Sequence, residues 1–316
     1  MLFAWSCAAA AAPTAQMVPV ADGVSLEVLD WGGHGSALVF LAGLGRTAHD
    51  FDDFAPAFTK RHHVYGITRR GYGASSKPPA TEANYAADRL GDDVLAVLAA
   101  LKLDHPVLAG HSMAGEEMSS IATRHPLTVA GLVYLDAGQS FALYDPEHGD
   151  IVVDLNELRR RLNRWDYSGV NVAEDERQTR DILDSRLLIL AHQGLEQHLR
   201  DLEPYKTLPP QPMTEQAAIG NAVMQGERKF TDLGGVPVLA IYASPHDVYR
   251  NPTPQTQAAA DADLALAARQ SALFEAAGAK IVRLPYASHF VWRTHRAEVL
   301  RAMEDFLGGL SRNPRN

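Results

Sequence analysis

The chain of 316 residues contains a single cysteine, Cys7, and this scarcity excludes two kinds of structure. An intramolecular disulfide needs two cysteines, and a cysteine-rich zinc site needs several. The compartment stays open, because an exported enzyme does not need a disulfide.

Two other features are missing. The chain has no run of five or six lysines and arginines and carries a net charge of −9, which argues against a nucleic-acid partner. Beyond the N-terminus, no apolar run reaches the roughly 18 residues that a membrane-spanning helix needs. The partner expected from this composition is a small molecule, and the expected assembly is a monomer or a homodimer.

Residues 1–17 form a separate segment, with an apolar, alanine-rich run that ends in small residues. The run is too short to span a bilayer and resembles the end of a signal peptide, although the basic start of such a peptide is missing. Two interpretations stay open. An atypical signal would direct the protein to the periplasm or the medium, whereas a disordered tail would leave it in the cytoplasm.

From about residue 18, short apolar runs alternate with segments of helical periodicity. The predicted strands are 24–29, 37–41, 63–67, 106–109, 131–135, 236–242 and 280–284. The predicted helices are 87–101, 116–125, 256–277 and 295–307. Unbroken apolar runs are typical of strands buried on both faces, and their alternation with helices predicts an α/β fold with a mostly parallel sheet.

One region interrupts this alternation. Residues 140–230 contain no convincing buried strand but several charged helical segments, at 155–165, 174–190 and 194–202. We therefore predict a helical cap inserted into a core that is formed by residues 18–139 and 231–316.

Ser112 lies between the predicted strand at 106–109 and the helix that follows it. A strand, a tight turn and a helix are the context of a nucleophile elbow, in which the serine backbone is strained. Small residues must flank the serine two positions before and after it, and Gly110 and Ala114 do so. The pattern predicts that Ser112 is the nucleophile of a serine hydrolase.

The order of further motifs resembles that of the α/β-hydrolase superfamily, over nearly the whole chain from residue 18. Residues 41–45 resemble its oxyanion loop, with Ala42 in place of the usual histidine, and residues 69–75 resemble its Arg-Gly-x-Gly-x-Ser loop. His289 follows the last predicted strand, where this family has its histidine, and Asp247 follows the strand before it, where the family has its acid.

The resemblance implies a role for each of these residues. His289 is the expected general base, and Asp247 is the expected acid that orients it. Asp136, which ends an earlier strand, is the alternative acid. The backbone N–H groups of Leu44 and Met113 are expected to form the oxyanion hole.

The expected reaction is hydrolysis of a carboxylic ester through an acyl-serine, with neither metal nor cofactor. Dehalogenases and epoxide hydrolases of this fold carry Asp in the elbow, so Ser112 argues against them. An amidase, a lactonase, an aminopeptidase-like enzyme or a carbon–carbon bond hydrolase remains an alternative, as does a non-catalytic ligand-binding protein of this fold. Candidate walls of the substrate pocket are Phe290, Phe141, Tyr144 and Trp165.

Overall fold

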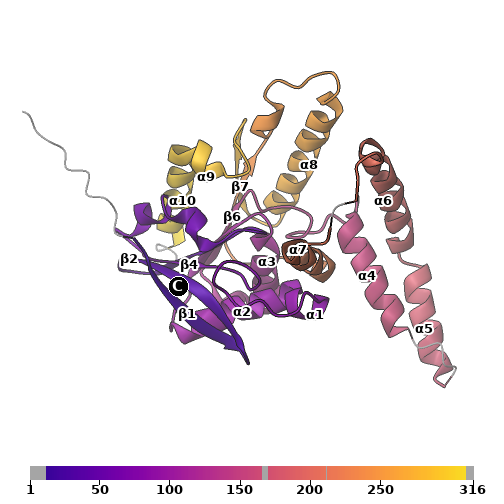
Figure 1. Ribbon diagram of the computed structural model, residues 1–316, viewed down its shortest axis with the longest axis horizontal. Coiled ribbons are helices and arrows are strands. Elements are labelled where there is room, and N and C mark those ends of the chain that lie inside the picture. The colour runs from indigo at the N-terminus through magenta and orange to yellow at the C-terminus, as the bar shows by residue number, and fades with distance from the viewer. Residues whose placement is uncertain (1–11, 166–169, 211, 311–316) are drawn as a thin grey trace, which may run out of the picture.

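An eight-stranded sheet forms the centre of the computed structural model, which describes residues 12–165, 170–210 and 212–310 (Figure 1). The strand order is β1-β2-β4-β3-β5-β6-β7-β8. Both pairs that involve β2 are antiparallel and the other five pairs are parallel, so the predicted mostly parallel sheet is confirmed. The bounds are β1 Thr14–Ala21, β2 Val24–Gly32, β3 Ala37–Leu41, β4 His63–Ile67, β5 Val107–His111, β6 Gly131–Leu135, β7 Val238–Ala243 and β8 Lys280–Leu284.

The first strand corrects the boundary placed at residue 17. β1 begins at Thr14 and pairs with β2, with Thr14 opposite Asp30. It is an edge strand in which only Val18 is fully buried, so it lacks the apolar run that identified the inner strands. The signal-like residues 1–11 lie outside the described residues.

Helices cover both faces of the sheet (Figure 1). On one face, α2 (Ala87–Ala100), α3 (Ala114–Arg124) and α8 (Gln257–Ala276) contribute buried side chains to a common core. The other face is covered by α9 (Val291–Thr294), α10 (Arg296–Leu310) and two short 3-10 turns at Ala48–Phe51 and Ala55–Phe58. Because both faces are covered, β3, β5 and β6 are buried along their whole length.

Between β6 and β7, the described residues form no strand but a series of helices. Their bounds are α4 Ile151–Arg164, α5 Val172–Leu183, α6 Leu187–Leu202, a 3-10 turn Glu203–Tyr205 and α7 Glu215–Gly226. Figure 1 shows α4, α5 and α6 projecting to one side of the molecule, whereas α7 lies closer to the sheet beside α1 (Glu82–Tyr85). We call α4–α7 the inserted helices.

The segment 174–190, expected as one helix, is divided into α5 and α6. The break follows Leu183, and the Ser185 hydroxyl donates to the Ile182 carbonyl at 2.8 Å. Such a side-chain bond competes with the helical backbone ladder. Within the part of the chain that the structure describes, no helix is long and apolar enough to cross a membrane.

Candidate active site

Ser112 stands in a sharp turn between β5 and α3. Its φ of 54° lies in the left-handed region, a strained conformation for a residue with a side chain. The Ser112 amide donates to the Leu135 carbonyl on β6 at 3.3 Å, which ties the turn to the neighbouring strand. A Cβ at Gly110 would lie 2.7 Å from the Met118 methyl group and 3.0 Å from the Ala114 Cβ, so the space there favours a small residue. The strain presents the serine side chain at the carboxyl end of the sheet.

The loop after β8 brings His289 to the same end of the sheet, but its acid partner differs from the one expected. His289 Nδ1 lies 2.7 Å from Oδ2 of Asp136. Within the described chain, no hydrogen bond joins the Asp247 carboxylate to this ring. The expectation for Asp247 is therefore corrected: Asp136, the alternative, occupies the position beside His289.

Asp136 is held in place as a buried anion. It follows β6 with a φ of 48°, and it is 1% exposed. Its Oδ1 accepts the Ala243 N–H at 3.0 Å, while Oδ2 accepts from both His289 and His246. Burial raises the pKa of Asp136, but the hydrogen bonds from His246 and His289 outweigh it and hold that pKa below its ordinary value.

His246 is the functional candidate that sequence reasoning missed. Its Nε2 lies 2.8 Å from Asp136 Oδ2, and its Nδ1 lies 2.8 Å from Oδ1 of Asp263 on α8. The hydrogen bond to Asp136 raises the pKa of His246 to about 9, against the effect of burial. The one sequence signal was its position directly after β7, at the same edge of the sheet as Ser112 and Asp136.

The side chains of Asp136, His246 and His289 also form a set of donors that lie within 4.8 Å of one another, close enough to share a metal ion. Each donor atom already has a hydrogen-bond partner inside the set. The hydrogen bonds therefore account for the grouping.

The loop after β3 packs directly against the elbow. A Cβ at Gly43 would lie only 3.2 Å from the Cβ of Ser112. The N–H groups of Leu44 and Met113 flank this contact, one in each loop, and neither has a hydrogen-bond acceptor among the described residues. Two unpaired main-chain donors beside a serine are the arrangement that an oxyanion hole requires.

His111 connects the elbow to the histidine loop. The ring is 2% exposed, and its Nε2 donates to the His289 carbonyl at 3.0 Å. Burial, with the nearby His289 adding to it, lowers the pKa of His111 to about 3, so the ring is neutral. This bond fixes the backbone of His289 relative to Ser112.

An apolar cluster lies beside the elbow and includes part of the inserted helices. Met113, Tyr72 and Ile219 of α7 are buried in it, and Leu44 and Phe141 pack against it. Helix α7 therefore packs beside the loop after β3. Tyr72 and Ile219 are buried members of this cluster that the sequence did not single out.

The four predicted pocket residues fall into two groups. Phe141 belongs to the cluster just described, and the Phe290 ring centroid lies 5.9 Å from that of His289. In contrast, the Tyr144 hydroxyl donates to Asp154 of α4 at 2.6 Å, in a buried contact. The Trp165 indole donates to Asp175 of α5 at 2.9 Å. Both residues thus form hydrogen bonds with the inserted helices.

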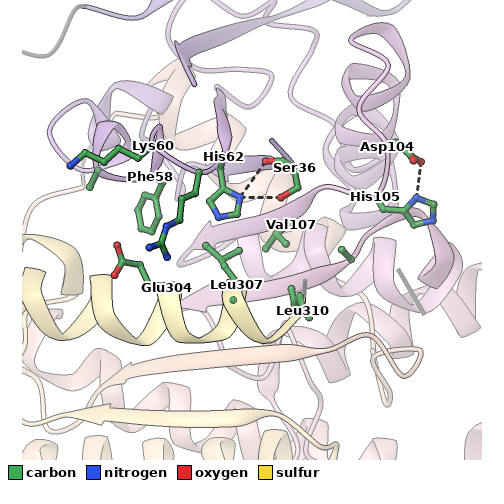
Figure 2. Close-up of a pocket in the computed structure, with 14 residues that line it drawn as sticks. Ser36, Phe58, Lys60, His62, Asp104, His105, Val107, Glu304, Leu307 and Leu310 are labelled. Atoms are coloured by element: carbon green, nitrogen blue, oxygen red, sulfur yellow. Dashed lines mark hydrogen bonds and ion pairs between the residues drawn. The ribbon is translucent and has the colours of Figure 1, made fainter. Parts of the chain in front are cut away.

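A separate cavity of about 870 Å³ lies at the opposite end of the sheet (Figure 2). Ser36 precedes β3, His62 precedes β4 and Val107 begins β5, whereas Ser112 and Asp136 follow β5 and β6. Figure 2 shows Ser36 bonded to His62 at its wall, with an Oγ–Nδ1 distance of 3.1 Å. This cavity is distinct from the Ser112 site.

Part of the chain is similar to known proteins. A family model described as alpha/beta hydrolase fold matches residues 36–181. A fluoroacetate dehalogenase from Burkholderia sp is 30% identical over 116 residues, which are 36% of this chain and 38% of the relative. The sn-1-specific diacylglycerol lipase ABHD11 of Mus musculus is 33% identical over 115 residues, 36% of each chain. The match thus spans less than two fifths of either relative.

Likeness to solved structures extends over nearly the full chain. The crystal structure of E-2-(acetamidomethylene)succinate hydrolase superposes with a TM-score of 0.56 and 21% identity, covering 94% of this chain and 99% of the other. Identity at this level shows the fold alone. The predicted α/β-hydrolase fold is confirmed.

Proposed function

The chain belongs to the α/β-hydrolase superfamily, and on that premise we propose that it is a serine hydrolase that cleaves carboxylic esters through an acyl-serine intermediate. The observation that carries the proposal is the convergence of three residues. Ser112 in a strained elbow, His289 after β8 and the buried carboxylate of Asp136 all lie at the carboxyl end of the sheet, where Asp136 contacts His289 and His111, next to Ser112, donates to the His289 carbonyl.

Each residue has a defined step in the proposed reaction. The Ser112 hydroxyl oxygen attacks the ester carbonyl carbon while His289 accepts the hydroxyl proton. Asp136 orients the imidazole and stabilises its cation. The oxyanion of the tetrahedral intermediate receives hydrogen bonds from the Leu44 and Met113 N–H groups.

The intermediate then collapses and the alcohol leaves with the proton from His289, so Ser112 carries the acyl group. Water attacks this ester in the same manner, with His289 as its base. The carboxylic acid is released and the serine hydroxyl is restored.

The identity of the elbow residue separates this proposal from the activities named for some relatives. A dehalogenase or epoxide hydrolase of this fold attacks carbon with an elbow carboxylate, as the resemblance implied. Ser112 instead offers a hydroxyl that needs a base, and His289 with Asp136 provides one. The apolar wall of Met113 and Ile219 suits an apolar acyl group.

Labelling by a fluorophosphonate probe tests the proposal, together with hydrolysis of p-nitrophenyl esters of increasing acyl length. We expect wild type to be labelled and active, and Ser112→Ala to lose labelling and at least 10⁴-fold in kcat. Ser120→Ala is the matched control, because Ser120 lies on α3 and its hydroxyl donates to Asp88. Unlabelled wild-type protein that cleaves no ester, or unimpaired Ser112→Ala, would refute the proposal.

A further inference from the structure

We propose that His246 and Asp263 are positioning residues of the Ser112 site, which set the orientation and the effective charge of Asp136 through a second imidazole on the same carboxylate oxygen. The inference rests on the proposed function, because it concerns the acid that supports His289. It extends the set Ser112, His289 and Asp136 by two groups.

The geometry brings three separate segments together. Asp136 Oδ2 accepts from His289 at 2.7 Å and from His246 at 2.8 Å, and the two imidazole centroids lie 6.2 Å apart. On its other side, the His246 ring meets Asp263 Oδ1 at 2.8 Å. The His246 backbone N–H also donates to Asp263 Oδ2 at 3.1 Å, so Asp263 holds both the ring and the main chain.

The partners of His246 determine its protonation. Each of its ring nitrogens faces a carboxylate oxygen, and an ionised carboxylate only accepts hydrogen bonds. Both nitrogens must therefore carry protons, which makes the ring an imidazolium. The pKa of His246, raised to about 9 chiefly by its bond to Asp136, agrees with this assignment.

A cation on Asp136 has a consequence for His289. The positive charge of His246 offsets the negative charge of Asp136, so the pair alone gives little stabilisation to a protonated His289. Asp263 adds a second negative charge and restores a net charge of about −1 to the three groups. His246 and Asp263 therefore act on His289 in opposite directions.

Two other titratable side chains beside this set, His111 and Tyr242, are neutral. His111, whose ring centroid is 4.4 Å from that of His289, is neutral because burial lowers its pKa to about 3. Burial, followed by repulsion from Asp136, raises the pKa of Tyr242 and keeps the phenol neutral. The remaining charged groups near the set are Asp50, Asp247, Arg283 and Arg293. These four residues are unchanged in the His246, Asp263, Ser112 and His63 variants used to test this proposal.

The test compares His246→Gln with Asp263→Asn by the pH dependence of ester hydrolysis. Loss of the His246 charge should move the acidic midpoint of the kcat/KM profile up by about one pH unit, because Asp136 then stabilises protonated His289 more strongly. Loss of the Asp263 charge should move that midpoint down by a similar amount. In the double variant the net charge is again about −1, so the midpoint should lie close to that of wild type.

A second readout does not depend on turnover. In Ser112→Ala protein with isotope-labelled histidines, NMR should show the His289 titration moving in the same two opposed directions. His63→Gln, which breaks a 2.9 Å pair with Asp30 remote from Ser112, should leave it unchanged. Asp263→Asn retains every side chain of the Ser112 set and serves where His246→Gln fails to fold.

The two proposals fail separately. Shifts in the same direction in both variants would overturn the role of His246 and Asp263, even if Ser112 is the nucleophile. So would shifts smaller than about 0.2 pH unit, where about one pH unit is expected. An enzyme that survives Ser112→Ala overturns the proposed function, while the NMR titration still reports on the charges around His289.

Discussion

Asp136, just after β6, and Glu116, in the first turn of α3, are two acids almost fully removed from solvent, yet the first is ionised and the second is neutral. Asp136 is 1% exposed and accepts from Ala243, His246 and His289. Glu116 is 0% exposed, and neither of its carboxyl oxygens has a hydrogen-bond partner within the described chain. Burial, and then repulsion from Glu227, raises the pKa of Glu116 well above its ordinary value.

The difference teaches that hydrogen-bond donors, and not burial alone, decide which buried carboxyl stays ionised. Asp136 carries a charge that can stabilise an imidazolium, whereas Glu116 in the first turn of α3 is neutral. Glu227 resembles Glu116: burial, then repulsion from Asp150, raises its pKa to about 8. The predictions below compare the ionised carboxylate, Asp136, with the neutral carboxyl groups, Glu116 and Glu227.

The largest effect is expected for Asp136→Asn. The asparagine amide keeps the shape of the side chain but removes its charge. It can no longer accept hydrogen bonds from both imidazoles, so kcat for an ester should fall about 10³–10⁴-fold. Steady-state kinetics of the folded variant measures this. Asp247→Asn is the matched control and should stay within about threefold of wild type. Equal losses in the two variants would restore Asp247 as the acid.

Glu116→Gln should change stability instead of activity. Wild-type Glu116 is protonated when folded and ionised when unfolded, so its contribution is complete below about pH 4.5 and is lost as pH rises toward the folded pKa. The glutamine variant should therefore gain about 1 kcal/mol over wild type per pH unit above that point. Urea unfolding at pH 5 and pH 8 measures the gain. A gain that does not grow with pH would show that Glu116 is ionised in the fold.

Glu227→Gln should have a smaller effect on the free energy of unfolding, limited to a defined pH range. Its raised pKa of about 8 confines the stability difference to the range between about pH 4.5 and pH 8. Above about pH 8 the difference from wild type should level off. Unfolding midpoints at three pH values measure this curve, and a difference that keeps rising above pH 8 would contradict the assignment.

Several parts of the site could be predicted because they depend on local sequence. The small residues Gly110 and Ala114 around Ser112 predicted the turn, and His289 was identified by following the last strand. The acid could not be chosen in this way. Asp136 and Asp247 both follow strands, and their order along the chain is compatible with either role.

The sequence by itself determined the inner strands, the helices that cover them, the elbow at Ser112 and the position of His289 after β8. These features are encoded by apolar periodicity and small residues over short stretches, which act before any long-range contact forms. The tertiary structure alone decided that Asp136 contacts His289, that His246 and not Asp247 turns inward, and that Asp263 reaches it from α8. Those outcomes depend on strand order, on side-chain directions at the strand ends and on which donors surround each buried carboxyl.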